Sequence, residues 1–217
     1  MLERVCRILF FLVVVKPLLF LLVGVNVFGR ENLPVKKQFI LVANHNSHLD
    51  ALALMNLFPL TQLHHIHPVA ASDYFLQNPL LAWFSQTFLN ILPIARSQFT
   101  RQTNPLTKMG EVLEQGDSLI LFPEGTRGQP EAMEPFQAGI AHVLKKHPEV
   151  PVIPVYLKGM GRSLPKGEKI LLPLFCDIMI GQPQYFSGTK EEIVQQVQDA
   201  VQKLQRDIVA MFMLEDE

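Results

Sequence analysis

The chain has little charge of either sign, with 19 Lys and Arg residues against 20 Asp and Glu residues and a net charge of -1. Without a broad basic excess, nucleic acid is not expected as a partner, because contacts to a phosphate backbone need clustered Lys and Arg. Cysteine is scarce as well, since only Cys6 and Cys176 are present. A disulfide framework is therefore not expected, and a reducing compartment fits.

What the chain has in excess is apolar sequence, at 48% of residues, with one long run near its start. From Ile8 to Val27 the run is interrupted by Lys16-Pro17, Gly24 and Asn26. Its length matches the roughly 20 residues of a membrane span. However, Lys16-Pro17 places a charge and a helix-bending residue at its middle. The sequence predicts two half-length helices dipping into one leaflet, with a single span or a buried core helix as alternatives.

Targeting signals around this run point to the cytoplasmic side of a membrane. Arg4 and Arg7 precede the run and Arg30 follows it, so both flanks satisfy the rule that places basic residues inside. No small-residue cleavage site follows the run, and a removed signal peptide is not expected. We therefore expect residues 1–28 to form a membrane-associated helical segment, monotopic or anchored by one segment.

Residues 29–217 are predicted to form one α/β domain, a size that allows a well-buried core. Apolar runs predict strands at Phe39–Ala43, His67–Ala71, Ile91–Ala95, Leu119–Phe122 and Val152–Leu157. Helical patterns occur at Asp50–Phe58, Pro79–Leu89, Pro105–Gln115, Gly139–His147 and Lys190–Phe212. Alternation of strands and helices indicates a largely parallel central sheet flanked by helices on both faces. In such folds the functional loops gather at the carboxyl ends of the strands.

The first polar motif follows the strand Phe39–Ala43 and contains His45 and Asp50. If a helix opens just after His45, five positions bring the carboxylate back near the imidazole. A carboxylate on one ring nitrogen fixes the tautomer, and the other nitrogen can then accept a proton. Such a pair could act as a general base, although the same spacing also arises when an Asp caps a helix.

The second motif, Phe122-Pro123-Glu124-Gly125-Thr126-Arg127, ends another apolar strand. Exposed backbone N–H groups beside a guanidinium are suited to holding an anion such as phosphate. A strand-to-loop turn with a surface salt bridge is the alternative interpretation. Arg96, at the end of Ile91–Ala95, offers a second guanidinium.

These motifs resemble the conserved blocks of the glycerolipid acyltransferase family, whose type members are bacterial 1-acyl-glycerol-3-phosphate acyltransferases. Asn44-His45 with Asp50 resembles the first block, and Phe122 to Arg127 resembles the third. Ile91 to Arg96 is similar to the second block but lacks its usual Gly and aromatic residue. Val150 to Val155 is similar to the fourth. The resemblance covers roughly Gly29 to Gly161.

The resemblance implies transfer of a fatty acyl group to a lysophospholipid hydroxyl, by default from lysophosphatidate to phosphatidate, at the cytoplasmic face of a bacterial inner membrane. It implies acyl-CoA or acyl carrier protein as donor substrate, with no metal and no bound cofactor. His45 would be the general base and Asp50 its orienting partner. By the same resemblance, the headgroup and acyl-chain contacts would involve Arg96, Glu124, Gly125, Thr126, Arg127, Ile153 and Pro154. Glu124 would anchor its loop by pairing with a cation.

Several alternatives stay open. Glycerol 3-phosphate, another lysophospholipid or an N-acyl amino-acid lipid would use the same His and Asp. A metal-dependent hydrolase could use His45, His48 and Asp50, and a lipid-binding protein would use the motifs without catalysis. The run His64-His65-x-His67 has no carboxylate or Cys nearby in sequence to complete a zinc site.

Overall fold

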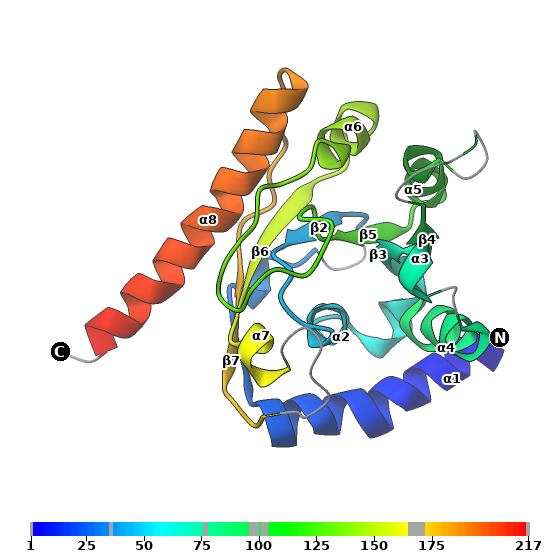
Figure 1. Ribbon diagram of the computed structural model, residues 1–217, viewed down its shortest axis with the longest axis vertical. Helices are drawn as coiled ribbons and strands as arrows, with labels where there is room; N and C mark the ends of the chain where they lie inside the picture. Colours follow the sequence, from blue (N-terminus) through cyan, green and yellow to red (C-terminus); the bar gives the residue numbers. More distant parts are fainter. Residues whose placement is uncertain are drawn as a thin grey trace.

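The computed structural model describes residues 2–34, 37–75, 78–95, 100, 104–164 and 172–215. Its centre is a seven-stranded sheet with the order β1-β7-β6-β2-β5-β3-β4 (Figure 1). The strands are β1 (Val25–Phe28), β2 (Ile40–Ala43), β3 (Ile66–Ala71), β4 (Leu92–Ile94), β5 (Ser118–Leu121), β6 (Val152–Lys158) and β7 (Cys176–Ile180). All neighbours pair in parallel except β6 and β7, which are antiparallel. The prediction of an α/β fold with a largely parallel sheet is confirmed.

The five expected strands correspond to β2 through β6, whereas β1 and β7 were not predicted from the sequence. These two strands pair with each other and carry a polar residue at matching positions, Asn26 opposite Asp177. Asn26 Nδ2 donates to Asp177 Oδ1 at 2.9 Å. A polar residue that interrupts an apolar run in the sequence is thus satisfied by a partner 151 residues away.

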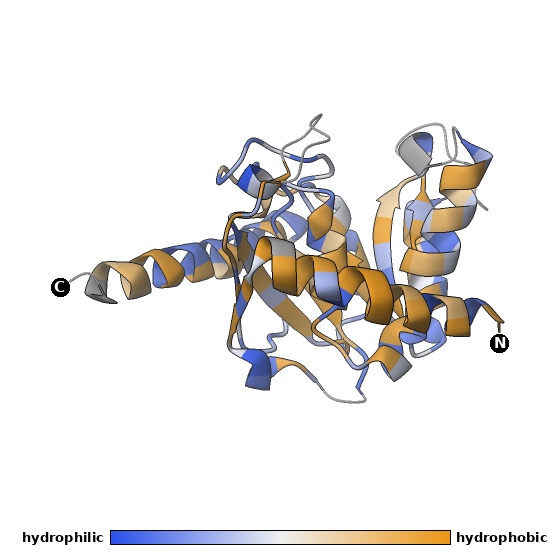
Figure 2. Ribbon diagram, turned by 90° about the horizontal axis from the view of Figure 1, so that it is seen from below, coloured by the Kyte–Doolittle hydropathy of each residue, from blue (hydrophilic) through white to orange (hydrophobic). Residues whose placement is uncertain are grey.

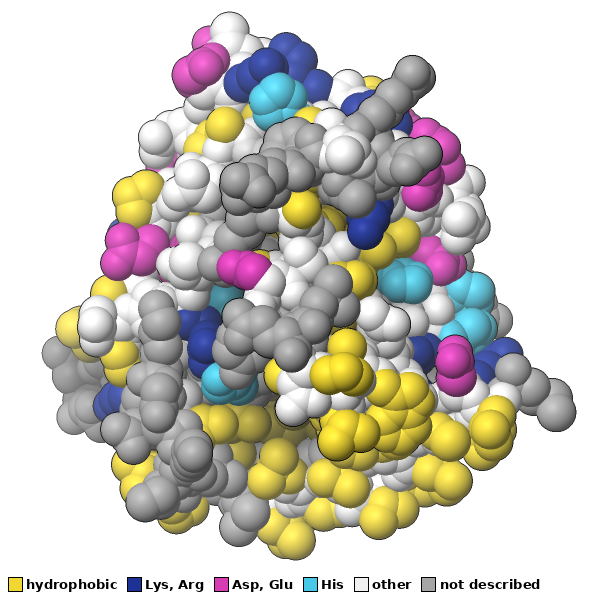
Figure 3. Space-filling view, turned by 45° about the vertical axis from the view of Figure 1, so that its right-hand side comes forward, with side chains coloured by type: hydrophobic (Ala, Val, Ile, Leu, Met, Phe, Trp, Pro, Cys, Tyr) yellow, Lys and Arg dark blue, Asp and Glu magenta, His cyan; other side chains and the backbone are white. Residues whose placement is uncertain are grey.

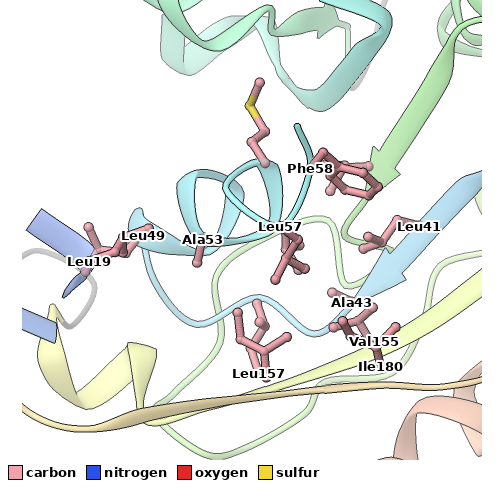
Figure 4. Close-up of a cluster of buried hydrophobic side chains, with 14 of the residues drawn as sticks. Leu19, Leu41, Ala43, Leu49, Ala53, Leu57, Phe58, Val155, Leu157 and Ile180 are labelled. Carbon is pink, nitrogen blue, oxygen red and sulfur yellow. The ribbon is translucent and has the colours of Figure 1, made fainter. Parts of the chain in front are cut away.

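Helices cover both faces of the sheet. On one face lie α5 (Pro105–Glu114), α6 (Gly139–Lys146) and α8 (Lys190–Glu215). On the other face α2 (Leu49–Met55) lies between the sheet and the N-terminal helix (Figure 4). The other short elements are η3 (Arg30–Asn32), η4 (Leu60–His65), α3 (Ser72–Phe75), α4 (Pro79–Leu89) and α7 (Met160–Ser163).

Two hydrophobic cores follow from the alternation of side chains along each strand. On β2, Ile40 and Val42 pack with α5, α6 and α8, and Leu41 and Ala43 pack with α2. All four side chains are fully buried, as expected for a strand near the middle of a doubly covered sheet. Burial of each large aliphatic side chain contributes about 1.5–3 kcal/mol, so β2 is firmly held at the position from which the first motif departs.

The N-terminal helix is continuous from Leu2 to Val23, through α1 (Leu2–Phe10) and the π-helical segments η1 (Phe11–Val15) and η2 (Leu18–Val23). The expected break at Lys16-Pro17 is therefore wrong. Pro17 has a φ of -61°, which suits a helix, and its missing N–H falls between two π-helical segments. The N–H of Lys16 bonds to the carbonyl of Phe11, five residues back.

The π-helical turns also match the sequence pattern of this helix. Its buried side chains recur every four residues, at Arg7, Phe11, Val15, Leu19 and Val23. In a helix of 3.6 residues per turn such a repeat would drift by about 40° per turn. Wider turns, with hydrogen bonds five residues apart, offset that drift and keep one face on the core.

The opposite face of this helix is apolar and exposed (Figure 2). Its exposed large side chains are Leu2, Val5, Leu9, Leu12, Val13, Val14, Phe20 and Leu21. On α4, Leu80 and Trp83 are also exposed. Hydrophobic side chains gather along the lower edge of the molecule in Figure 3, where α1 and α4 lie in Figure 1. Within the described ranges, no helix combines the length and hydropathy needed to cross a membrane.

Candidate active site

The first residue of the first motif, Asn44, makes with its side chain the hydrogen bonds that a further strand residue would make with its backbone. Asn44 is buried, and its Oδ1 accepts from the N–H of Leu157 on β6 at 2.7 Å. Its Nδ2 donates to the carbonyl of the same residue at 2.9 Å. The side-chain amide therefore extends the β2–β6 pairing by one position and fixes where His45 begins. This role of Asn44 was not predicted from the sequence, although an Asn directly after a buried strand is a signal for such a contact.

The structure brings His45 and Asp50 together. His45 Nδ1 lies 2.9 Å from Asp50 Oδ2. The same oxygen accepts the backbone N–H groups of Asn46 and Ser47, each at 2.8 Å. Asp50 is fully buried in the first turn of α2, so these contacts take the place of water. An acceptor at Nδ1 places the proton there and leaves His45 Nε2 as a base.

The His45 ring is also held from one side by an aromatic neighbour. It stacks on Phe122, at the end of β5, with ring centroids 4.1 Å apart and an angle of 22° between the planes. Because β2 and β5 are neighbours in the sheet, the two motifs meet at their carboxyl ends. The imidazole is thus fixed by a carboxylate at its edge and an aromatic ring on its face.

Glu124 ties the second motif to the backbone of the first. Its Oε1 accepts the N–H of His45 at 2.9 Å, and the N–H of Gly128 donates to the carbonyl of His45 at 2.9 Å. Glu124 is 4% exposed, and this burial raises its pKa to about 7. The family resemblance implied a cation as the partner of Glu124, whereas the carboxyl group contacts the backbone amide of His45.

Gly125, Thr126 and Arg127 form the turn after Glu124. Gly125 has a φ of +75°, a conformation that glycine adopts without steric cost. The turn brings Arg127 Nη1 into contact with His48 Nε2. Burial and the neighbouring guanidinium lower the pKa of His48. A neutral His48 can therefore accept a hydrogen bond from Arg127, and the two side chains together border the site.

A cavity of about 630 Å³ opens beside His45. Its polar lining includes His45, His48, Thr126 and Arg127, and also Asp73, Ser85 and Gln137. The apolar remainder is formed by residues of α2, β3, α4, β4, α5, β5 and α6 and the loops beside them, among them Leu52, Val69, Phe84, Ile91, Ile94, Met109, Leu121 and Val143. A largely apolar cavity with a few polar groups suits an amphipathic ligand.

Two predicted site residues do not join this cluster, and a third is not described. Arg96 lies outside the described residues. Ile153 and Pro154 are buried within β6, and the described lining of the cavity does not include them. The cavity lies on the β5, β3 and β4 side of β2, whereas β6 is its neighbour on the opposite side.

The histidines of the run at residues 64–67 acquire a carboxylate that is distant in sequence. His65 Nδ1 lies 2.6 Å from Asp117 Oδ1, and His67 Nε2 lies 2.9 Å from Asp117 Oδ2. This cluster lies at the amino ends of β3 and β5, at the opposite edge of the sheet from His45. Over the part of the chain that the structure describes, no group of three or more His, Cys, Asp or Glu side chains is arranged to hold a metal ion.

A model of the Acyltransferase family matches residues 24–158, a segment that contains His45, Asp50 and the Glu124–Arg127 turn. The chain belongs to this family. A chloroplastic 1-acyl-sn-glycerol-3-phosphate acyltransferase of Brassica napus is 30% identical over 168 residues, covering 76% of this chain and 46% of that protein. The 1-acyl-sn-glycerol-3-phosphate acyltransferase of Saccharomyces cerevisiae is 34% identical over 137 residues, covering 60% of this chain and 42% of that protein.

The fold of this family member is also found in a solved structure. The crystal structure of the 1-acyl-sn-glycerophosphate (LPA) acyltransferase PlsC from Thermotoga maritima has a TM-score of 0.72 and 25% identity. The match covers 88% of this chain and 76% of that one. The chain spans less than half the length of the curated relatives named above.

Proposed function

We propose that this chain transfers a fatty acyl group from a thioester donor to the hydroxyl of a lysophospholipid, with lysophosphatidate as acceptor and phosphatidate as product. The observation that supports this most directly is the 2.9 Å contact of His45, which lines a largely apolar cavity of about 630 Å³, with the buried Asp50. A base beside an apolar cavity can deprotonate a hydroxyl next to a bound acyl chain.

In the proposed reaction, His45 Nε2 takes the proton of the acceptor hydroxyl while its oxygen attacks the thioester carbonyl carbon. Asp50, at Nδ1, stabilises the imidazolium that forms. The new C–O bond is complete when the C–S bond breaks, and the imidazolium returns its proton to the leaving sulfur. The products are an ester and a free thiol, and the base is regenerated.

The remaining residues would position the substrates. Arg127 would hold the phosphate of the acceptor, because a guanidinium can bind phosphate through two parallel hydrogen bonds. Arg96 stays a prediction for the same headgroup. Glu124 and Gly125 would shape the turn that carries Thr126 and Arg127. The acyl chain would lie in the apolar cavity, with acyl-CoA or acyl carrier protein as the donor.

Association with a lipid bilayer would occur through the exposed apolar face of the N-terminal helix together with α4. Phe20 is 81% exposed, Leu80 76% and Trp83 61%. Exposed apolar side chains grouped on one edge are typical of a membrane or protein contact. An interfacial position, with the helix in the plane of the membrane surface, fits a helix that packs one face on the protein core and exposes apolar side chains on the other.

The experiment that tests this function measures thiol release from acyl-CoA and from acyl carrier protein donors, with lysophosphatidate in detergent. Wild type is compared with His45→Ala and with the matched control His142→Ala on α6, with and without chelator. We expect acceptor-dependent release that survives chelator and is lost with His45→Ala alone. No release by the wild type, or release retained by His45→Ala, would contradict the proposal.

A further inference from the structure

A second cavity, of about 500 Å³, adjoins the first. Three residues, Thr126, Arg127 and Gln137, line both cavities, so the segment that carries Arg127 separates them. The residues that line only the second cavity are Glu124, Gly128, Gln129, Pro130, Glu134 and Pro135. A volume within the usual range of about 300–1,000 Å³ is sufficient for a small-molecule group.

Hydrogen bonds join the loop at residues 129–132, which forms one wall of this cavity, to the motif that contains His45. Asn46, next to His45, donates from Nδ2 to the carbonyl of Gln129 at 2.5 Å and to that of Ala132 at 3.0 Å. Its own Oδ1 accepts from Asn44 at 2.8 Å. A continuous series of hydrogen bonds thus runs from β6 through both asparagines to the wall, and the cavity is held in a fixed position relative to His45.

A strained residue anchors the same wall from the other side. Glu131 has a φ of +62°, in the left-handed region that non-glycine residues rarely adopt. Its Oε1 accepts the N–H of Gly159, after β6, at 2.8 Å and lies 3.8 Å from Arg162 Nε. Backbone strain of this kind persists where surrounding contacts enforce it, and it is concentrated at functional sites.

The side chains of the second cavity suit a neutral, amide-bearing chain rather than an anion. Gln129 and Gln137 offer side-chain amides that both donate and accept, and Glu124 and Glu134 are carboxyl groups. The basic residue in the described lining is Arg127, which contacts His48. The Glu134 carboxylate would repel a phosphate, whereas the N–H groups of an amide-bearing chain can donate to it.

We propose that the second cavity receives the amide-bearing pantetheine arm of the thioester donor. Acyl-CoA and acyl carrier protein share this arm, which ends in the sulfur of the thioester. In the bound donor, the acyl chain lies in the first cavity and the thioester carbonyl carbon lies beside His45. The sulfur and the pantetheine arm then extend past Thr126 and Arg127 into the second cavity. This inference rests on the proposed function and names where that function binds its donor.

The test compares donors with and without the arm. Palmitoyl-CoA, palmitoyl-pantetheine and the palmitoyl thioester of ethanethiol are offered to the wild type and to Gln129→Trp, which fills the second cavity. Glu134→Ala is a second variant that leaves the volume open and removes a hydrogen-bond acceptor. Gln195→Trp, at an exposed position of α8, is the matched control. Thiol release gives kcat/KM for each donor, and lysophosphatidate is varied separately to obtain its KM.

We expect both cavity variants to lower kcat/KM for palmitoyl-CoA and palmitoyl-pantetheine by about tenfold, the loss of one or two hydrogen bonds. The ethanethiol thioester, the KM of lysophosphatidate and the control should not change. A loss confined to palmitoyl-CoA would assign the cavity to the nucleotide and overturn the proposal. An equal loss with all three donors, a raised KM for lysophosphatidate, or no change would also overturn it. No release by the wild type from any of these donors or from a palmitoyl carrier protein would instead contradict the proposed function and remove this inference with it.

Discussion

Asp50 Oδ2 contacts His45 Nδ1 at 2.9 Å while accepting two backbone N–H groups from the start of the same helix. One oxygen therefore orients the ring and organises the turn that leads into α2. Its position is set by hydrogen bonds rather than by side-chain packing alone. The two tasks can be separated by a substitution that keeps the shape of the side chain.

Asp50→Asn is expected to lower kcat by about 10²–10⁴, the usual contribution of general-base help, with little change in either KM. The amide can still accept backbone N–H groups but cannot stabilise an imidazolium. Steady-state kinetics would measure this, with Asp199→Asn on the exposed side of α8 as control. A kcat equal to that of the wild type would remove Asp50 from the mechanism.

Arg127→Ala is expected to raise the KM for lysophosphatidate by about 10–100-fold, since a hydrogen bond to a charged group contributes about 1.5–3 kcal/mol. Arg127→Lys should restore little of the affinity for lysophosphatidate, because an ammonium group lacks the planar, two-pronged geometry with which a guanidinium binds phosphate. A monoacylglycerol acceptor, which has no phosphate, should show no such difference between the variants. Arg206→Ala on α8 is the control, and an unchanged KM for lysophosphatidate would place the phosphate elsewhere.

Gly125 and Gly116 form a matched pair for testing the turn of the second motif. Their φ values are +75° and +84°, and an added Cβ would meet no atom closer than 3.7 Å at either position. Each Gly→Ala change should reduce stability by about 1–2 kcal/mol through backbone strain. Only Gly125→Ala should also lower kcat/KM, because Thr126 and Arg127 follow it. Equal activity of the two variants would show that the turn geometry does not matter.

The titration of Glu124 should make the free energy of unfolding depend on pH. Burial raises its pKa to about 7, whereas a glutamate in an unfolded chain titrates near about 4.3. Between these values the folded protein keeps a proton that the unfolded chain has lost, so the free energy of unfolding falls as pH rises.

Glu124→Gln removes this titration and can still accept the N–H of His45. Relative to this variant, the wild type should lose a few kcal/mol between about pH 4.3 and 7, at about 1.4 kcal/mol per pKa unit. Denaturant titrations at several pH values would measure the difference, with Glu191→Gln at the exposed start of α8 as control. Parallel pH profiles for wild type and Glu124→Gln would contradict the assignment.

The fluorescence of Trp83 can report whether the exposed apolar surface of the protein contacts lipid. Trp83 is the only tryptophan in the chain and is 61% exposed on α4. Adding lipid vesicles should shift its emission to shorter wavelength. Phe20→Ser should weaken vesicle co-sedimentation by tenfold or more, since burying a Phe contributes about 1.5–3 kcal/mol. Tyr185→Ser, at a side chain 66% exposed, is the control. Equal losses for Phe20→Ser and Tyr185→Ser would argue against this surface.

The parts of the fold that depend on local sequence pattern were predictable from the sequence. The strands β2, β5 and β6 are continuous apolar runs, and their parallel pairing explains why polar motifs 79 residues apart meet. The helix α4 has the predicted bounds, Pro79–Leu89, because Asn78 caps it at one end and Asn90 adopts a left-handed conformation at the other. Local signals of this kind are readable from sequence.

The rest depended on strand order and distant pairing, which the sequence does not display. Ile153 and Pro154 were expected at the acyl site because of their motif, but β6 lies across β2 from the cavity. The pairing of Asn26 with Asp177 and of Asp117 with two histidines joins residues far apart in the chain. The break expected at Pro17 ignored the wider π-helical turns that accommodate it.

The helix α2, whose first turn contains Asp50, rests directly on the N-terminal helix, with Leu49 and Leu19 in the same hydrophobic core (Figure 4). The helix whose outer face is proposed to contact lipid therefore also lies beneath the carboxylate that is proposed to orient the catalytic base. Deleting the N-terminal helix to improve solubility would expose the face of α2 that packs on it and would loosen the turn around His45. Any shortened form of this protein should be judged by its acyl-transfer activity as well as by its solubility.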